Sequence, residues 1–245
     1  MKRLPFVCAV SALFAAGTAA QFGLAALNPV KAPVAGESFL AAMGGLRSIA
    51  AEIVWFRLDR LQETGRYGEL VQLSSLLAFL EPHESEVWVY TAWNMAYNIS
   101  VRMPSEEDRW PWVYEAVKLL RGKGLALNPS SAAIYREIAF LFELKIGADI
   151  DSAAPFYRRE WKKLVEDAAA RGAWSELDMD PAEMARIAKE EKIEDWTDPQ
   201  ASAIYWARLG LERSDAKSLA NSKDGAFLKE VLRQARMLYA KNHGG

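Results

Sequence analysis

The feature that most restricts the fold of this chain is the regular spacing of helix-breaking residues between stretches with a helical pattern. From residue 38 onward, apolar residues recur with the helical period, and Gly or Pro interrupts at helix-length intervals. Long runs of alternating β-branched residues are absent. This pattern predicts an all-α fold. The expected helices span residues 38–64, 67–80, 85–101, 105–127, 131–146, 152–171, 181–191, 199–213 and 224–241.

Several helix starts carry local signals of their own. Asp180-Pro181 and Asp198-Pro199 each combine a side-chain oxygen that accepts a backbone N–H with a Pro in the first helical position. Ser105 precedes three acidic residues, which the positive end of a helix dipole favours. We therefore expect helices to begin directly after these N-cap residues.

Two segments of the chain share one layout, which indicates a repeat. In Leu80–Tyr90 (LEPHESEVWVY) and Leu127–Glu137 (LNPSSAAIYRE), a helix ends in Leu-x-Pro and a new helix with an aromatic residue follows. A boundary after each Pro places unit starts near Ala51, Ser85 and Ala132. The first interval is 34 residues and the second is 47, and we assign the extra 13 residues to a longer connection between helices.

A helix–turn–helix unit of 34 residues that closes with Pro resembles the tetratricopeptide repeat (TPR). The resemblance covers residues 51–161, and Leu58, Leu70 and Val117 depart from it at positions where the family has smaller residues. It implies a right-handed solenoid of helical hairpins. The whole chain is similar to membrane-anchored bacterial proteins of this type, a similarity that implies no biochemical role. The matching residues are Gly65 and Tyr67 at the turn, Pro82 and Pro129 at the unit ends, Trp88 and Tyr135 at the early aromatic position, and Ala92 and Ala139 at the small-residue position.

This interpretation divides the chain into five parts. They are a signal peptide or membrane anchor (1–30), a linker with the start of the first helix (31–50), TPR-like repeats (51–172, as 51–84, 85–131 and 132–172), a linker with a short helix (173–198) and a C-terminal capping helical pair (199–245).

Residues 4–30 contain no charged side chain and follow Lys2 and Arg3. The stretch is longer than the roughly 7–15 apolar residues of a secretory signal, and it reaches the ~20 residues that span a bilayer. Because basic residues stay cytoplasmic, we predict a single-pass protein of the bacterial inner membrane with its C-terminal body in the periplasm. A signal cleaved after Ala20, followed by export, and a buried helix are the alternatives.

Composition argues against several kinds of site. A net charge of −2 provides no basic surface for nucleic acid. One Cys permits no intrachain disulfide. With only two His, a zinc site or a His-based triad would have to form almost without His or Cys. Asp149 and Asp151 are spaced like calcium ligands, but the Gly and bidentate Glu of a calcium loop are missing, so a turn with an N-cap is expected. We predict no metal, no cofactor and no catalytic residue.

Residues 86–100 hold two Trp, two Tyr and two Asn. At 3.6 residues per turn, Trp88, Ala92, Met95 and Ile99 form one stripe, which is expected to pack against the second helix of the same unit. A second stripe consists of Val89, Trp93, Ala96, Tyr97 and Ser100.

We expect this second stripe to face a concave groove shared by the first helices of successive units. Aromatic residues with Arg are typical of binding centres, so the groove predicts a partner-binding site. Asn94 and Asn98 would hold a peptide backbone there, or instead bond to nearby backbone of the same helix. Glu63 and Glu143 would add to the rim. The predicted partner-binding residues are Trp55, Asp59, Val89, Trp93, Asn94, Tyr97, Arg136 and Phe140.

These observations favour a non-enzymatic adaptor or scaffold in an envelope or secretion assembly. It would bind a protein or peptide through the aromatic groove, and the membrane through residues 4–30. Two alternatives remain open. An envelope enzyme acting on glycan would use linker carboxylates such as Glu176 and Asp178. A purely structural subunit would have the groove filled by its own helices.

Overall fold

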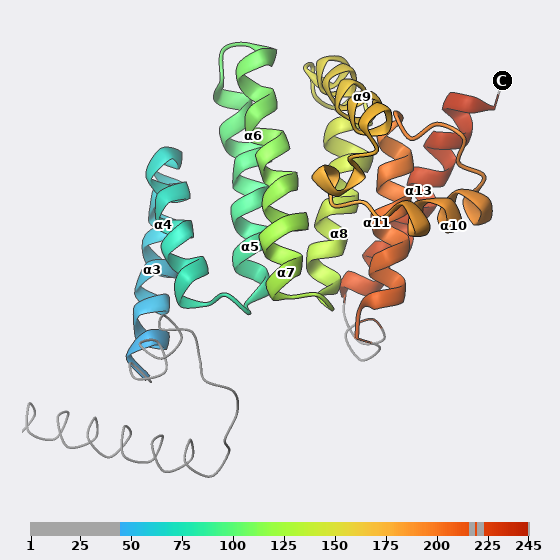
Figure 1. The fold of residues 1–245 in the computed structure, drawn as a ribbon. Helices are drawn as coiled ribbons and strands as arrows, with labels where there is room; N and C mark the ends of the chain where they lie inside the picture. The colour runs from blue at the N-terminus through green and yellow to red at the C-terminus, as the bar shows by residue number, and fades with distance from the viewer. Residues whose placement is uncertain (1–44, 216–218, 220–222, 245) are drawn as a thin grey trace, which may run out of the picture.

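The computed structural model describes residues 45–215, 219 and 223–244, and throughout these residues the regular elements are helices, as predicted (Figure 1). The same residues contain no helix both long and apolar enough to cross a membrane. The expected N-terminal apolar helix falls in residues 1–44, outside the described residues. The α-helices are α3 (Gly45–Glu63), α4 (Tyr67–Leu80), α5 (Ser85–Trp93), α6 (Glu106–Leu119), α7 (Leu125–Leu127), α8 (Ala132–Phe140), α9 (Ala154–Arg171), α10 (Pro181–Glu191), α11 (Pro199–Arg213) and α13 (Lys223–His243).

Helix starts agree with the local signals in the sequence. The side chains of Asp180 and Asp198 accept the backbone N–H groups of Ala182 and Gln200, each at 2.8 Å. Ser105 Oγ accepts the backbone N–H of Asp108 at 3.2 Å. These bonds satisfy donors that a helix start leaves without an intrahelical partner.

Three expected continuous helices instead contain π-helical turns. These are η1 (Asn94–Ile99), η3 (Leu120–Gly124) and η4 (Leu141–Ile146), and a short 3₁₀ turn, η2 (Ser100–Arg102), follows η1. In η1, Asn94 donates to the carbonyl of Tyr90 at 2.9 Å, so its side chain competes with the helical backbone bond. A π-turn inserts an extra residue and rotates the faces that follow it.

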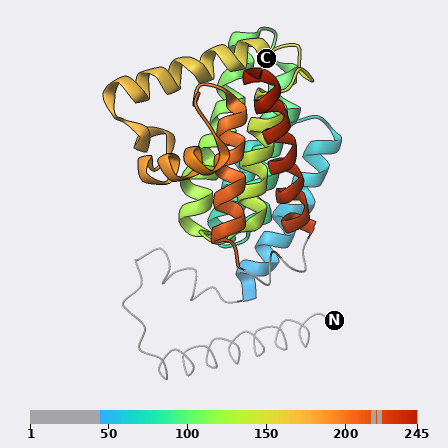
Figure 2. The same ribbon diagram turned by 90° about the vertical axis from the view of Figure 1, so that its right-hand side faces the viewer.

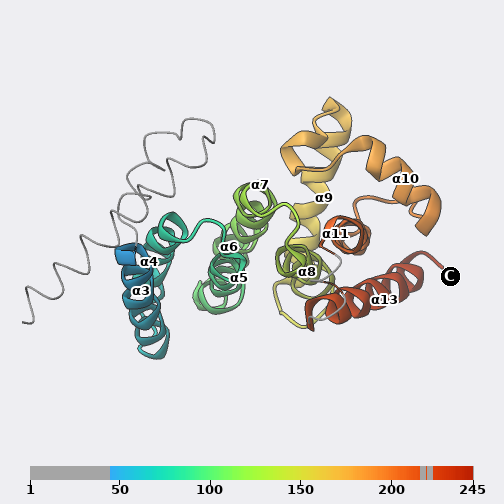
Figure 3. The ribbon, with the colours of Figure 1, turned by 90° about the horizontal axis from the view of Figure 1, so that it is seen from below.

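The helices form hairpins that lie side by side (Figure 1). α3 packs on α4, α5 on α6, and α8 on α11, which in turn packs on α13. Seen from below, α3, α5, α8 and α13 lie along one side of the molecule (Figure 3). α9 and α10 lie on one side of α11 and α13 on the other (Figure 2). The C-terminal helix therefore joins the side that carries α5 and α8.

The hydrophobic core is divided into two clusters. The smaller cluster joins α3, α4 and the start of α5, with Leu58, Leu70 and Leu77 fully buried. The larger one extends from α5 to α13, and Tyr157 and Trp161 are its largest fully buried side chains. The α3–α4 hairpin thus has a core of its own.

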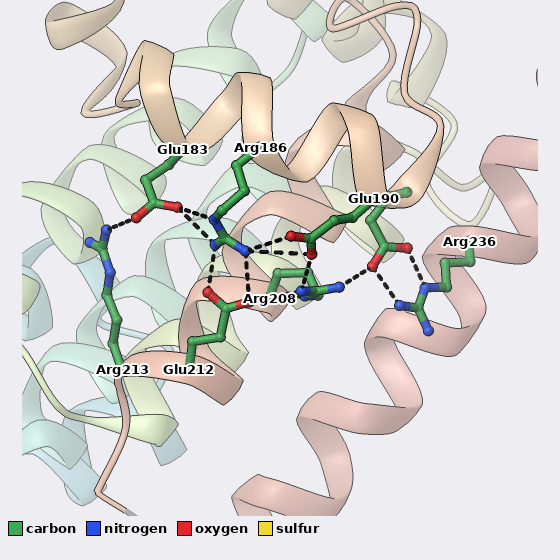
Figure 4. Close-up of polar contacts among 8 residues, drawn as sticks. Glu183, Arg186, Glu190, Arg208, Glu212, Arg213 and Arg236 are labelled. Atoms are coloured by element: carbon green, nitrogen blue, oxygen red, sulfur yellow. Dashed lines mark hydrogen bonds and ion pairs between the residues drawn. The ribbon is translucent and has the colours of Figure 1, made fainter.

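Arginines and glutamates tie α10, α11 and α13 together (Figure 4). Glu191 on α10, with a side chain only 6% exposed, bridges Arg208 of α11 and Arg236 of α13, each at 2.5 Å. Burial acts to raise the pKa of Glu191, but hydrogen bonds from Arg236 and Arg208 outweigh it and lower that pKa. The remaining pairs of the network are Arg186 with Glu183, Glu190 and Glu212, Arg208 with Glu190 and Glu212, and Arg213 with Glu183.

Candidate functional site

Four aromatic side chains from four helical elements form a continuous series, which we call the aromatic row. Trp93 ends α5, Tyr97 lies in η1, Phe140 ends α8 and Phe227 lies near the start of α13. Successive ring centroids are 6.0, 6.4 and 5.3 Å apart. These spacings are those of favourable ring pairs. Three of the predicted site residues are therefore brought together, and a residue that was not predicted joins them.

The two ends of the aromatic row reach the surface. Trp93 is 38% exposed and Phe227 is 41% exposed, whereas Tyr97 and Phe140 between them are half-buried. A large aromatic side chain left this open at the end of a packed row is available for contact with another molecule.

Trp55 and Asp59 lie on α3, away from the aromatic row in sequence and in packing. Trp55 contacts Tyr90 edge to face, with centroids 5.3 Å apart, and the Tyr90 hydroxyl donates to Gln62 Oε1 at 2.6 Å. Asp59 is exposed. Trp55 therefore belongs to a second ring pair, which fastens α3 to α5.

The expectation that Val89 and Asn94 line an open groove is corrected by their burial. Val89 is 7% exposed within the larger core, and Asn94 is fully buried. The Asn94 amide group donates to the Tyr90 carbonyl, and its oxygen accepts from Asn98 at 2.7 Å. Ser100, in the same predicted stripe, is also buried. Val89 precedes the π-turn η1, so its burial reflects a core that covers more of the α5 surface than the inner stripe alone.

The other stripe of the same segment behaves as predicted. Trp88, Ala92, Met95 and Ile99 are all buried in the larger core, with exposed fractions of 8% or less. The sequence therefore predicts the inner face of this helix correctly.

α8, with the η4 turn that follows it, faces α13 through three pairs of residues. Arg136 forms an ion pair with Asp224, and Phe140 contacts Phe227. The Arg136 guanidinium also lies 5.8 Å above the Phe227 ring centroid and 3.5 Å from Glu137. The chain's own C-terminal helix thus covers the α8 end of the predicted groove.

The third pair consists of two acids, Glu143 on η4 and Glu230 on α13. Burial raises the pKa of Glu143, and the negative charge of Glu230 raises it further. Hydrogen bonds from Arg233 and Gln234 lower the pKa of Glu230 to about 2, so this carboxylate stays ionised. Like charges placed together favour a cation between them.

Glu137 adds negative charge beside the aromatic row. Burial raises its pKa to about 7, although the Arg136 guanidinium acts to lower it, and the charge of Glu86 adds to the rise. Burial also raises the pKa of Tyr97, and the charges of Glu137 and Glu143 contribute to that effect. Carboxylates therefore lie near Tyr97, together with the cationic side chains of Arg136 and Lys145 beside the aromatic row.

A buried ion pair between Lys145 and Asp151 lies beside Tyr97 of the aromatic row. Lys145, 2% exposed, donates to Asp151 at 2.5 Å, and its Nζ lies 5.1 Å from the Tyr97 ring centroid. Burial acts to raise the pKa of Asp151, but hydrogen bonds from Lys145 and from the Ala153 backbone, with the charge of Arg109, lower it. Asp151 does accept the Ala153 N–H, at 3.0 Å, as the expected turn requires.

Glu176 and Asp178, the linker acids considered for glycan chemistry, contact different arginines. Glu176 is paired with Arg171 at 2.6 Å, which lowers its pKa. Asp178 lies 3.2 Å from Arg121, whose buried guanidinium also donates to the carbonyl of Leu177 at 2.9 Å. A general acid for glycoside cleavage needs a raised pKa, so these contacts do not favour that use.

Two features of the site escaped sequence reasoning. The α13 face carries Asp224, Phe227 and Glu230 at intervals of three, and Arg136, Phe140 and Glu143 follow one another at intervals of four and three on the facing side. That complementarity of charge and ring is the signal that could have placed α13 on α8. The Lys145–Asp151 pair had no such signal, because a helical Lys is usually exposed.

Fold and site together define an all-helical protein, in the part of the chain that the structure describes, with a partly open aromatic row bordered by carboxylates and by two cations. Among the described residues, no group of three or more His, Cys, Asp or Glu is arranged to hold a metal ion. Comparison of the chain with protein families, with curated proteins and with solved structures finds no match to it.

Proposed function

We propose that this chain is a membrane-anchored or exported adaptor of TPR-like build, which binds a protein or peptide partner on the aromatic row. The observation that carries the proposal is the exposure of Trp93, at 38%, at the end of a row of packed rings. Packed helices hold these rings in place before any partner arrives, so little ordering entropy opposes binding. An adaptor of this kind acts by recognition and needs no catalytic group.

The partner segment is expected to be basic with apolar residues between its charges. Glu143 and Glu230 lie close enough to shift a pKa, and Glu137 does the same to Tyr97. A Lys or Arg side chain would gain from these carboxylates and from the faces of Trp93 and Tyr97. An acidic segment would be repelled.

Two synthetic peptides of equal length and apolar content test this chemistry, one rich in Lys and Arg and the other in Asp and Glu. We expect the full chain to bind the basic peptide about tenfold more tightly or better. Trp93→Ala should weaken that binding about tenfold. Glu230→Gln should weaken it roughly two- to fivefold, as expected for an exposed charge. Equal affinity for the two peptides would contradict the proposal.

Stability measurements separate a binding role from a packing role for Trp93. Trp93→Ala should lower the free energy of unfolding by about 2 kcal/mol, because 38% of the residue is already in water. The matched control is Trp161→Ala, which empties a fully buried site and should cost about 3–5 kcal/mol. A similar loss for Trp93→Ala would identify that residue as structural.

The proposed location is the bacterial inner membrane, with residues 45–244 in the periplasm, or the periplasm itself after cleavage. It is supported by the uncharged stretch at residues 4–30 after Lys2 and Arg3. Alkaline phosphatase, which is active only outside the cytoplasm, is fused after residue 245. High activity is expected with the native start. Insertion of two Arg within residues 4–30 should abolish it.

A further inference from the structure

The junction between the first two helical hairpins contains a surface pocket of about 240 Å³. Its lining residues come from α4 on one side, and from α5, α6 and the η3 turn on the other. α4 is the neighbour of α5 in the row of helices (Figure 1). Ala78, in the wall of the pocket, packs against both clusters of the hydrophobic core. A molecule bound in this pocket would therefore contact both hairpins.

Apolar side chains form much of the pocket wall. Phe79 of α4 is 53% exposed, Leu119 of α6 is half-buried and Trp88 of α5 is buried. The Trp88 indole N–H already donates to the Pro82 carbonyl at 3.0 Å, so this ring offers apolar surface to the pocket. Because a cavity of about 150 Å³ is enough for benzene, this pocket has room for a single ring with a short substituent at each end.

A hydroxyl group at the buried side of the pocket lacks a partner. Ser74 is 1% exposed, and its Oγ forms no hydrogen bond within the residues that the structure describes. Thr91, also buried, donates its hydroxyl hydrogen to the Val87 carbonyl at 2.7 Å, so its oxygen keeps the capacity to accept. A buried hydroxyl without a partner costs free energy. A ligand that brings an O–H group to this side would remove that cost.

Lys123 supplies a positive charge at the open side of the pocket. It is exposed, it alone is charged among the lining residues, and no acid is paired with it in the described chain. Glu115, eight residues earlier, is already paired with Lys118 at 2.7 Å. Glu84, one turn before Trp88, is exposed and is not a lining residue. A carboxylate therefore fits the open side better than an ammonium group does.

We propose that this pocket binds a small aromatic carboxylate. The ring would lie between Phe79 and Trp88, with its carboxylate at Lys123 and any hydroxyl group at its other end directed to Ser74. None of the four residues of the aromatic row lines the pocket, so the site does not depend on the adaptor role proposed above. A bound ligand would stabilise the contact between the α3–α4 hairpin and the rest of the molecule.

Three probes of nearly equal size test the two polar ends of the site. They are 4-hydroxyphenylacetate, phenylacetate and the uncharged phenylacetamide, each titrated by ligand-observed NMR into the full chain in detergent, with empty micelles as the blank. For 4-hydroxyphenylacetate we expect a dissociation constant of about 1 mM or lower. Phenylacetate, which lacks the hydroxyl group, should bind roughly two- to tenfold more weakly. Phenylacetamide should bind a further two- to fivefold more weakly, at roughly the strength of an exposed ion pair.

Matched variants assign each preference to one residue. Ser74→Ala should remove the preference for the hydroxylated probe and keep the preference for the carboxylate. Lys123→Gln should do the reverse. Lys118→Gln is the control, because Lys118 is already paired and lies outside the pocket, and it should change neither preference. Ala78→Leu should fill the pocket and abolish binding of all three probes, with circular dichroism to show that the variant is folded.

Three results would overturn the proposal. Equal affinity for the three probes would remove the role of both polar ends. Absence of binding at about 10 mM of each probe would remove the site itself. Binding that persists unchanged in both Lys123→Gln and Ser74→Ala would place the probes elsewhere on the chain, whether or not Ala78→Leu folds.

Discussion

Phe227 lies edge-on against Phe140, with ring centroids 5.3 Å apart and ring planes at 69°. The two residues belong to helices far apart in the sequence, and the Arg136–Asp224 ion pair joins the same helices one turn earlier. The contact places α13 at one end of the aromatic row. The stability of the α8–α13 contact therefore determines how much of the row is exposed to another molecule.

Phe227→Ala should lower the free energy of unfolding by about 2 kcal/mol, less than the roughly 3–5 kcal/mol of a fully buried Phe. The side chain is 41% exposed, and a ring pair contributes about 0.5–1.5 kcal/mol beyond burial. Urea unfolding of the full chain measures this, with Phe227→Leu as the control that keeps the apolar contact. A loss of several kcal/mol would mean that Phe227 is a core residue of the C-terminal pair.

The raised pKa of Glu137 predicts a stability that falls as pH rises. Burial moves this pKa from 4.5 to about 7, so between these values the folded chain holds a proton that the unfolded chain has released. Folding is therefore favoured below pH 4.5, and the advantage is lost as pH approaches 7. The loss amounts to up to about 3 kcal/mol for a shift of this size.

Glu137→Gln should remove this dependence, because the amide does not ionise. Urea unfolding at about pH 5 and about pH 8 measures the difference between the variant and the native chain. The variant should be the more stable of the two at the higher pH. Glu86→Gln, on the exposed neighbour, is the control and should change the slope only slightly. Parallel pH profiles for the native chain and Glu137→Gln would contradict the prediction.

The buried Lys145–Asp151 pair should be costly to break from one side. Lys145→Met leaves Asp151 with Arg109 at 3.7 Å as its remaining cationic partner. We expect a loss of about 3–5 kcal/mol, and partial recovery when Asp151→Asn is added, because the second change removes the unpaired charge. Denaturant unfolding of the two single variants and the double variant measures the coupling.

The same pair predicts a loss of stability in acid. The pKa of Asp151 is lowered in the folded chain, so its contribution is present above the unfolded value of about 3.9 and disappears as pH falls below it. The Asp151→Asn variant should lack this part of the acid sensitivity. Unfolding measured at about pH 6 and about pH 3 compares the two chains.

Arg121 should hold the segment 174–178 in place. Its side chain is fully buried, and it donates to the carbonyls of Leu177 and Glu176 at 2.9 and 3.3 Å. Arg121→Met leaves these acceptors without that donor, so limited proteolysis should cut this segment faster. Arg171→Gln is the control, because Arg171 contacts the same segment from the surface with a side chain 48% exposed. Equal cleavage of both variants would contradict the prediction.

Local signals explain why the helices could be predicted. Helix α4 spans Tyr67–Leu80 as expected, and the Asp-Pro pairs at 180 and 198 begin α10 and α11. In each case the determinant lies within a few residues of the helix end. One amino-acid sequence is therefore sufficient to predict helix ends, because the residues that determine them are close together along the chain.

The features that were missed depend on long-range contacts. Arg136 and Asp224 are 88 positions apart, and their pairing places α13 over part of the expected groove. The π-turn η1 begins at the buried Asn94, and a regular helical period does not predict such a turn. Val89 and Asn94 are buried and do not line an open groove, because the core covers more of this helix than its apolar stripe indicates, whereas Trp93 is exposed.

From the division of the core into two clusters we expect two cooperative units of unequal size. The α3–α4 hairpin buries its leucines largely among themselves, with Val87 as the contribution of α5. Backbone amides in that hairpin should therefore exchange with solvent through a sub-global opening that leaves α8 and α11 protected. Such an opening has to break the Trp55–Tyr90 ring contact that joins α3 to α5, but it leaves the aromatic row from Trp93 to Phe227 intact.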